Sequence, residues 1–382
     1  MNSFRLLAKQ FFDGEHFHHN KIITIDNGQI IAIESSTNKQ QVNETISDLL
    51  APGFIDLQVN GGGKILFNAS PSLNGLKAIV NAHTQYGTTA LLPTLITDKI
   101  AIMQQAADAV AAAIKQKLAG VIGIHFEGPH LSVAKKGAHL EKFIRPISTA
   151  EWQILTRQDL GQIVVTLAPE NVAPDDIHRM VALGIKVCLG HSNADYHTAQ
   201  QAIDAGADGF THLYNAMSPL QGREPGIVGA AFLNKHTSCG LIVDGHHVNY
   251  HSAKIALQIK PQGKVFLVTD AMPPVGCSDS EFELLGRKVT LSQGKLTLET
   301  GELAGSVLDM ATGVRNIYQH LALPLDEALR MASLYPAHYI NQTKMRGTLK
   351  VGSQADMVVL DNNQQVQSTW IAGKKVYQYT PK

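Results

Sequence analysis

The sequence predicts an α/β protein: a (β/α)8 barrel of the TIM type that carries a small, discontinuous β-sandwich domain. Eight short apolar runs alternate with helical patterns through the middle of the chain, and both ends are rich in strand and turn signals. The length of 382 residues also suits a barrel of ~250 residues plus a smaller unit.

The eight apolar runs are GFIDLQV, TTALLPTLI, GVIGIHFEG, QIVVTLAPE, IKVCLGH, GFTHLYN, CGLIVDG and KVFLVTDA. They are apolar throughout, as a parallel sheet that is buried on both faces requires. Segments with apolar residues at i, i+3 and i+4 lie between several of them, for example DKIAIMQQAADAVAAAIKQK, ADYHTAQQAIDAGA and NYHSAKIALQI. This alternation predicts a parallel barrel, which we assign to residues 51–347.

The small β domain is expected to combine residues 1–50 with residues 348–382. FRLLAKQFFDG and HHNKIITIDNGQIIAIES alternate in polarity and contain Asp-Gly and Asn-Gly pairs, which are strong hairpin signals. The segment GTLKVGSQADMVVLDNNQQVQSTWIAGKKVY returns to short strands and turns. Because the two strand-rich ends flank the barrel, we expect them to pair with each other.

Composition argues against several classes of function. The chain holds 32 Lys+Arg and 32 Asp+Glu, and this balance favours neither a nucleic-acid partner nor a membrane surface. No apolar stretch approaches the ~18 residues of a membrane helix, and the N-terminus lacks the apolar core of a secretory signal. Three cysteines, an odd and low number, are typical of a reducing cytoplasm.

Polar side chains stand where the apolar runs stop, and in this class of barrel that end carries the active site. These residues are Asp56, Gln58, Asn60, His125, Glu127, His191, His212, Asp244 and Asp270. Any one of them alone is more often structural, but histidines and carboxylates at one rim together predict a divalent-metal site that leaves a position for water. A bound cation also compensates the cost of burying Glu127. His125 sits deeper, and we expect it to support the ligands.

The motifs are similar to those of the N-acetylglucosamine-6-phosphate deacetylase family of the amidohydrolase superfamily. The matching segments are PGFIDLQVNG, HFEGPH, KKGAHLEKFIR, GHSNAD, THLYNAM, GREPG, DGHHV, VTDA, LAGS and SLYPA. They occur in the family's order and span nearly the whole chain. The resemblance implies hydrolysis of the acetamide of N-acetyl-D-glucosamine 6-phosphate in amino-sugar catabolism and recycling. It also implies a small sugar-phosphate partner and a homodimer or higher oligomer.

The resemblance assigns roles to individual residues. Glu127, His191 and His212 match the metal ligands, Asp270 matches the general base that becomes the general acid, and His139 matches a group that orients or polarises the substrate carbonyl. The substrate contacts that it implies are Gln58, Ala138, His139, Asn215, Ala216, Arg223, His247, Leu303, Ala304 and Gly305. Arg223 and His247 match the phosphate contacts, and in this family one such contact can come from the neighbouring subunit.

One departure from the superfamily bears on the number of metal ions. Many amidohydrolases carry His-x-His at the end of the first barrel strand and bind two ions, whereas this chain has Gln58 and Asn60 there. Amides are poor metal ligands beside imidazoles. We therefore expect one divalent ion per subunit: zinc first, with iron or another divalent ion as the alternative.

Three other functions stay open on the sequence. The first is the same reaction on N-acetylgalactosamine 6-phosphate, and the second is a different barrel enzyme acting on sugar phosphates, such as an isomerase. The third is a non-catalytic scaffold that kept the amidohydrolase fold; such a protein is expected to have lost a ligand or Asp270, and here all are present. Neither GxxxxGK[ST] nor a GxGxxG after a strand occurs, so no nucleotide cofactor is supported.

Overall fold

The protein, represented by a computed structural model, is described over residues 4–37 and 40–380. Its central element is an eight-stranded parallel sheet with the order β14-β13-β12-β11-β10-β9-β8-β5. The strands are β5 (Phe54–Val59), β8 (Thr88–Ile96), β9 (Gly123–Glu127), β10 (Gln162–Leu167), β11 (Lys186–Leu189), β12 (Gly209–Phe210), β13 (Ser238–Leu241) and β14 (Val265–Leu267). The two edges meet where Val59 bridges Ala271. Each predicted apolar run overlaps one strand, which confirms the barrel.

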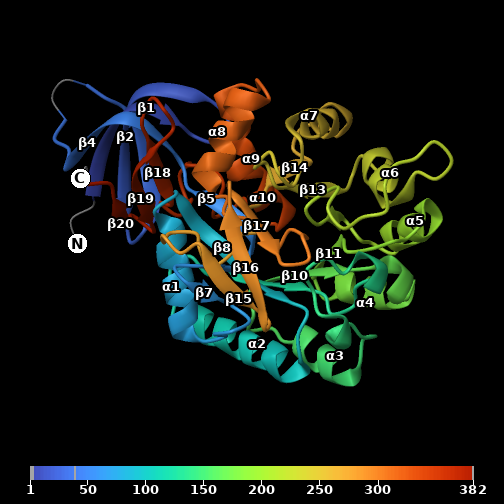
Figure 1. Ribbon diagram of the computed structural model, residues 1–382. Coiled ribbons are helices and arrows are strands. Elements are labelled where there is room, and N and C mark those ends of the chain that lie inside the picture. Colours follow the sequence, from blue (N-terminus) through green and yellow to red (C-terminus); the bar gives the residue numbers. More distant parts are fainter. Residues whose placement is uncertain (1–3, 38–39, 381–382) are drawn as a thin grey trace.

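Helices surround this sheet (Figure 1). They are α1 (Leu73–Thr84), α2 (Ile100–Lys115), α3 (Thr149–Leu155), α4 (Pro174–Ala182), α5 (Tyr196–Asp204), α6 (Gly226–Leu233), α7 (Tyr250–Ile259), α8 (Met310–His320), α9 (Leu325–Ala332) and α10 (Leu334–Tyr339), with short 3-10 turns at Val133–Lys135, Glu141–Phe143 and Pro169–Asn171. The three clearest helical patterns form α2, α5 and α7. Helix α5 begins after Asp195, whose side chain accepts from the Thr198 N–H at 2.8 Å and so caps it. Among the described helices, none is long and apolar enough to cross a membrane.

The two ends of the chain form one seven-stranded sheet with the order β20-β19-β18-β4-β1-β2-β3. Its strands are β1 (Phe4–Phe12), β2 (Phe17–Asp26), β3 (Gln29–Ser35), β4 (Glu44–Pro52), β18 (Met357–Leu360), β19 (Val366–Ile371) and β20 (Lys374–Gln378). Figure 1 shows the blue and dark red strands side by side, next to both termini. The rings of Phe4 and Trp370 are 5.7 Å apart, although two strands separate β1 from β19 in the sheet. The sheet therefore curls around a core of its own.

A third sheet, which sequence analysis did not predict, follows β14. It contains β15 (Glu281–Leu284), β16 (Arg287–Ser292) and β17 (Lys295–Leu298), all antiparallel, and is orange in Figure 1. Its turns Leu285-Gly286 and Gln293-Gly294 have positive φ at both residues, the conformation that two-residue hairpins need. Each turn carries glycine but not the usual Asn or Asp before it, so the hairpin signal is only half present. A short hairpin of β6 (Gly61–Gly62) and β7 (Ile65–Leu66) precedes α1.

Asp56 joins the first and last strands of the barrel. The side chain is fully buried; one of its oxygens accepts from the Thr269 hydroxyl at 2.5 Å, and the other accepts from the backbone N–H groups of Gln58 and Thr269. Burial raises the pKa of this carboxyl from 3.8 to about 7. Asp56 was among the polar residues at the strand ends, and in the structure it closes the barrel beneath the mouth.

The raised pKa makes a prediction about stability. The folded protein binds the proton of Asp56 more tightly than the unfolded chain, so its stabilising effect is complete below pH ~4 and is lost as pH rises through ~7. Asp56→Asn mimics the neutral carboxyl. We expect the free energy of unfolding of this variant, relative to the unchanged protein, to increase by a few kcal/mol between pH 5 and 8.5, measured by urea unfolding. Contributions common to both proteins cancel in the difference, and parallel pH profiles would contradict the assignment.

Candidate active site

Three side chains from neighbouring strands converge at the mouth of the barrel. Glu127 ends β9, while His191 and His212 follow β11 and β12 by two residues each. The Nε2 atoms of His191 and His212 lie 3.2 and 3.1 Å from Glu127 Oε1 and 3.0 Å from each other. All three residues are buried. The structure thus brings together the three residues that the sequence predicted as ligands.

Their proton positions indicate a need for a cation. His191 Nδ1 lies 2.9 Å from the Lys135 carbonyl oxygen, which can only accept, so Nδ1 carries a proton. A ring with this single proton presents a lone pair at Nε2. That lone pair then faces both a carboxylate oxygen and another imidazole nitrogen. A divalent cation held among the three atoms relieves the repulsion between them, as does a proton on His212 Nε2 that is donated to Glu127. Two imidazole nitrogens and one carboxylate oxygen form a ligand set suited to a divalent transition metal or zinc.

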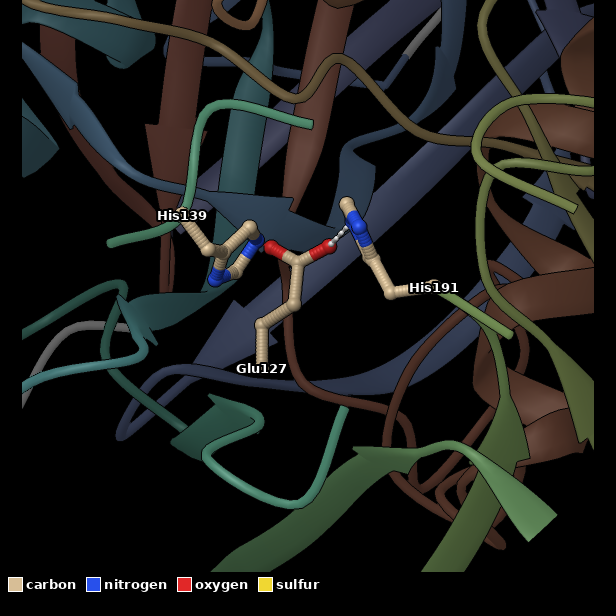
Figure 2. Close-up of side chains that lie close together, drawn as sticks. All are labelled: Glu127, His139 and His191. Atoms are coloured by element: carbon tan, nitrogen blue, oxygen red, sulfur yellow. Dashed lines mark hydrogen bonds and ion pairs between the residues drawn. The ribbon is translucent and has the colours of Figure 1, made fainter. Parts of the chain in front are cut away.

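His139 competes with His212 for the third place in this set. Ligand atoms of Glu127, His139 and His191 lie within 4.8 Å of one another, and Figure 2 shows the rings of His139 and His191 on either side of the carboxylate. However, the Thr97 backbone N–H donates to His139 Nδ1 at 3.3 Å. Burial, followed by the nearby His191, lowers the pKa of His139 to about 3. The Thr97 hydroxyl oxygen also lies 2.9 Å from His139 Nδ1. A neutral ring that accepts from the Thr97 N–H carries its proton on Nε2, and in this tautomer Nε2 is a donor, which favours His212 as the third ligand.

Asp270 lies opposite this group and is held by two amides. Asn60 Nδ2 donates to Asp270 Oδ1 at 2.6 Å, and Gln58 Nε2 donates to the same oxygen at 3.2 Å. Gln58 Nε2 also lies 3.2 Å from Glu127 Oε1. Burial and then the charge of Glu127 raise the pKa of Asp270 to about 6. A carboxylate whose pKa lies near neutrality is suited to take up a proton and return it.

Several of these residues adopt a backbone conformation that is unusual for them. The φ angles are +47° at His191, +32° at His212, +51° at Ala216 and +53° at Asp270. Left-handed conformations of non-glycine residues cost energy and concentrate at functional sites. His191, His212 and Asp270 lie within three residues of the end of a barrel strand, where the sharp change of direction turns a side chain into the mouth, and Ala216 lies in the loop after β12. The sequence placed these residues at the strand ends but gave no sign of this geometry.

A cavity of about 340 Å³ opens above Glu127, His191 and His212. The predicted substrate contacts that line it are Ala138, His139, Asn215, Ala216, His247, Leu303 and Gly305. Ala304 is buried between two lining residues, and Gln58 acts through Asp270 and Glu127. The ring of His247 is oriented by Asp244, whose Oδ2 accepts from His247 Nδ1 at 2.7 Å.

The cavity also has lining residues that were not among the predicted substrate contacts. Asn60, Ile96, Met272, Leu284 and Glu302 are among its lining residues. Leu284 comes from β15, and the neighbouring Arg287 donates from Nη2 to the Ala138 carbonyl oxygen. The unpredicted sheet therefore packs on the KGAH loop and forms one side of the site. The alternating polarity of the segment EFELLGRKVTLSQGKLTL is the signal from which this sheet could have been predicted.

His125 and Arg223 lie apart from this cavity. His125 Nε2 is 2.7 Å from Thr166 Oγ1 and its Nδ1 is 3.0 Å from the Leu57 carbonyl oxygen, so the ring sits in the layer beneath the ligands. Arg223 is exposed, on the loop before α6, and is not a lining residue. The next residue, Glu224, accepts from the N–H groups of Tyr196 and Gly226.

The fold and this site define a class of enzymes. A family model described as the amidohydrolase family matches residues 49–376, so the chain belongs to the amidohydrolase family and is a metal-dependent hydrolase. This result sets aside the isomerase alternative. The presence of all three predicted ligands and Asp270 argues against a non-catalytic scaffold.

Similar proteins within the family carry more specific names. The chain is 51% identical over 348 residues to an N-acetylgalactosamine-6-phosphate deacetylase from Shewanella sp. (strain ANA-3), covering 91% of this chain and 88% of that protein. It is 38% identical to an N-acetylglucosamine-6-phosphate deacetylase from Bos taurus, covering 86% of this chain and 84% of the relative. The crystal structure of the N-acetylglucosamine-6-phosphate deacetylase from Pasteurella multocida aligns with a TM-score of 0.94 at 36% identity, covering 98% of this chain and 99% of that chain.

Proposed function

We propose that this protein hydrolyses the acetamide of N-acetyl-D-glucosamine 6-phosphate to D-glucosamine 6-phosphate and acetate. The observation that carries the proposal is the cavity in which three convergent ligand atoms face a carboxylate that is held by two amides. Glu127, His191 and His212 would hold one divalent ion, zinc first and iron or another divalent ion second. Asp270 would move the proton.

The chemistry follows from the roles of these groups. When bound, the ion supplies Lewis acidity toward the carbonyl oxygen and the attacking water. Asp270 takes a proton from the water as the water oxygen bonds to the carbonyl carbon. His139 donates from Nε2 to the carbonyl oxygen as negative charge develops there. The C–N bond then breaks with its electron pair moving onto nitrogen, which takes the proton from Asp270. The amine formed takes up the remaining acidic proton of acetic acid, which leaves acetate.

The phosphate would be bound at the other end of the cavity. His247 lines the cavity wall and is held in a fixed orientation by Asp244. Arg223 is exposed on its own chain, which fits a guanidinium that completes the site of a second subunit in a homodimer or higher oligomer. We also assign the protein to the cytoplasm, because all three of its cysteines are free thiols.

The galactosamine epimer is the second candidate substrate, and the 51% identity to an N-acetylgalactosamine-6-phosphate deacetylase favours it. The deciding experiment measures acetate release from both N-acetylhexosamine 6-phosphates, with and without a chelator. A higher kcat/KM for the galactosamine epimer would reassign the substrate, and release from neither would overturn the proposed function.

Replacement of Arg223 tests the phosphate contact. We expect Arg223→Ala to lower kcat/KM for the phosphorylated sugar by roughly 10-fold to 10³-fold, because a charge-assisted hydrogen bond is lost. Arg223→Lys should restore only part of the loss, since an ammonium lacks the planar fork of arginine. Unphosphorylated N-acetylglucosamine, assayed on the same three proteins, should be barely affected. An equal loss on both sugars would show that Arg223 does not recognise the phosphate.

A further inference from the structure

We propose that Asn60 contacts the substrate: its side-chain oxygen accepts a hydrogen bond from the acetamide N–H while its nitrogen holds Asp270. This inference rests on the proposed function and adds a residue to it. Sequence analysis placed Asn60 at the rim of the barrel, as an amide at a position where two-metal relatives carry histidine, but assigned it no contact with the substrate.

The orientation of the Asn60 amide is fixed by its partner. Asn60 Nδ2 lies 2.6 Å from Asp270 Oδ1, and an ionised carboxylate can only accept a hydrogen bond, so the nitrogen must be on that side. The side-chain oxygen, Oδ1, then points away from Asp270. This oxygen is buried and has no hydrogen-bond partner in residues 4–37 and 40–380. Asn60 is at the same time a lining residue of the cavity.

The backbone prevents Asn60 from turning elsewhere to find a donor. Its N–H donates to the Ala271 carbonyl oxygen at 3.0 Å, and its own carbonyl oxygen accepts from the Phe67 N–H at 2.8 Å. The next residue, Gly61, is fixed by the His83 ring, whose Nε2 lies 2.9 Å from the Gly61 carbonyl oxygen. A buried acceptor that is held unpaired beside a cavity requires an explanation, and a donor on the bound molecule supplies one.

The chemistry of the substrate identifies that donor. Asp270 protonates the leaving nitrogen, so this nitrogen must approach Asp270, and Asn60 is hydrogen-bonded directly to Asp270. Before bond cleavage, the same nitrogen carries the amide N–H of the substrate. An Asn60 oxygen that accepts this hydrogen turns the N–H away from Asp270. The lone pair that develops on nitrogen as the carbonyl carbon becomes tetrahedral is then directed toward the proton on Asp270.

The test removes the N–H from the substrate and the acceptor from the protein. The two substrates are the 2-acetamido sugar 6-phosphate and its ester counterpart, the 2-O-acetyl sugar 6-phosphate, in which oxygen replaces the N–H. Asn60→Ala is compared with Gln58→Ala, which also removes a hydrogen bond to Asp270 Oδ1, although Gln58 is not a lining residue of the cavity. Thermal unfolding and bound metal, measured on each variant, show that fold and ligand set are intact.

We expect Asn60→Ala to lose at least about tenfold more kcat/KM on the amide than on the ester, and Gln58→Ala to show a clearly smaller difference. Asn60→Asp keeps an acceptor oxygen but sets a second carboxylate against Asp270. It should be slow on both substrates, with an amide-to-ester ratio close to that of the unchanged protein. If Asn60→Ala and Gln58→Ala shift the ratio equally, Asn60 acts only through Asp270 or through a water, and the inference is wrong. That outcome leaves the proposed function standing, whereas an unchanged protein that hydrolyses neither epimer overturns both.

Discussion

Asp270→Asn is expected to lower the rate of acetate release by ~10²–10⁴-fold or more, the usual contribution of a general acid–base group. Asparagine keeps the size of the side chain and still presents an oxygen to the amides of Asn60 and Gln58, which donate to Asp270 Oδ1. It cannot take a proton from water at neutral pH. The loss should therefore appear mainly in kcat, while substrate binding, measured by calorimetry, is retained.

Asp56→Asn is the matched control for this experiment. Asp56 is also a fully buried carboxyl. It accepts hydrogen bonds from Thr269, the residue before Asp270, but it is not a lining residue of the cavity. We expect this variant to keep most of its activity at pH 7. Near-normal turnover by Asp270→Asn would mean that another residue moves the proton, and the role assigned to Asp270 would be wrong.

The second large effect concerns the metal. Glu127→Gln and His212→Ala should each lose most of the bound ion and nearly all activity, because each removes one of the three converging ligand atoms. We expect chelation to inactivate the unchanged protein and one equivalent of a divalent ion per chain to restore it. Elemental analysis and activity are measured on the same samples. Two tightly bound equivalents, both needed for turnover, would contradict the single-metal proposal.

His139→Gln distinguishes the two candidate ligand sets. In the tautomer that accepts the Thr97 N–H at Nδ1, the His139 ring presents a donor to the cavity, and its loss should leave the ion in place. Activity should nevertheless fall by ~10²–10³-fold, as measured for the loss of a hydrogen bond to a developing oxyanion. If His139→Gln loses the ion and His212→Ala retains it, the ligands are Glu127, His139 and His191.

The sequence was sufficient for the barrel and for the residues at its mouth. Parallel strands that are buried on both faces need continuous apolar runs, and this requirement located even β12, which is only Gly209–Phe210. A polar residue directly after such a run is conspicuous, so Glu127 and Asp270 stood out. Strand order also follows from the alternation with helices, because parallel strands need crossover connections.

Contacts between side chains that lie far apart along the chain could not be predicted from the sequence. Asn60 and Asp270 are separated by 210 positions, and only the closed barrel brings their side chains together. The same holds for Arg287 and Ala138, 149 positions apart, which set the unpredicted sheet against the cavity. The tautomers of His139 and His191 likewise depend on backbone groups of Thr97 and Lys135, and no local pattern specifies them.

The seven-stranded sheet has a consequence for the way the chain is synthesised. Strand β4, which leads directly into the first barrel strand, pairs on one side with β18, and Pro52 stands opposite Met357. A ribosome therefore releases β4 long before its neighbour exists. Throughout that interval the nascent chain exposes an unpaired strand edge, a template for association with other chains. Native assembly of this sheet is thus delayed until β18 has been synthesised, and a message cut short before β18 yields a chain that contains every barrel strand and still exposes this edge.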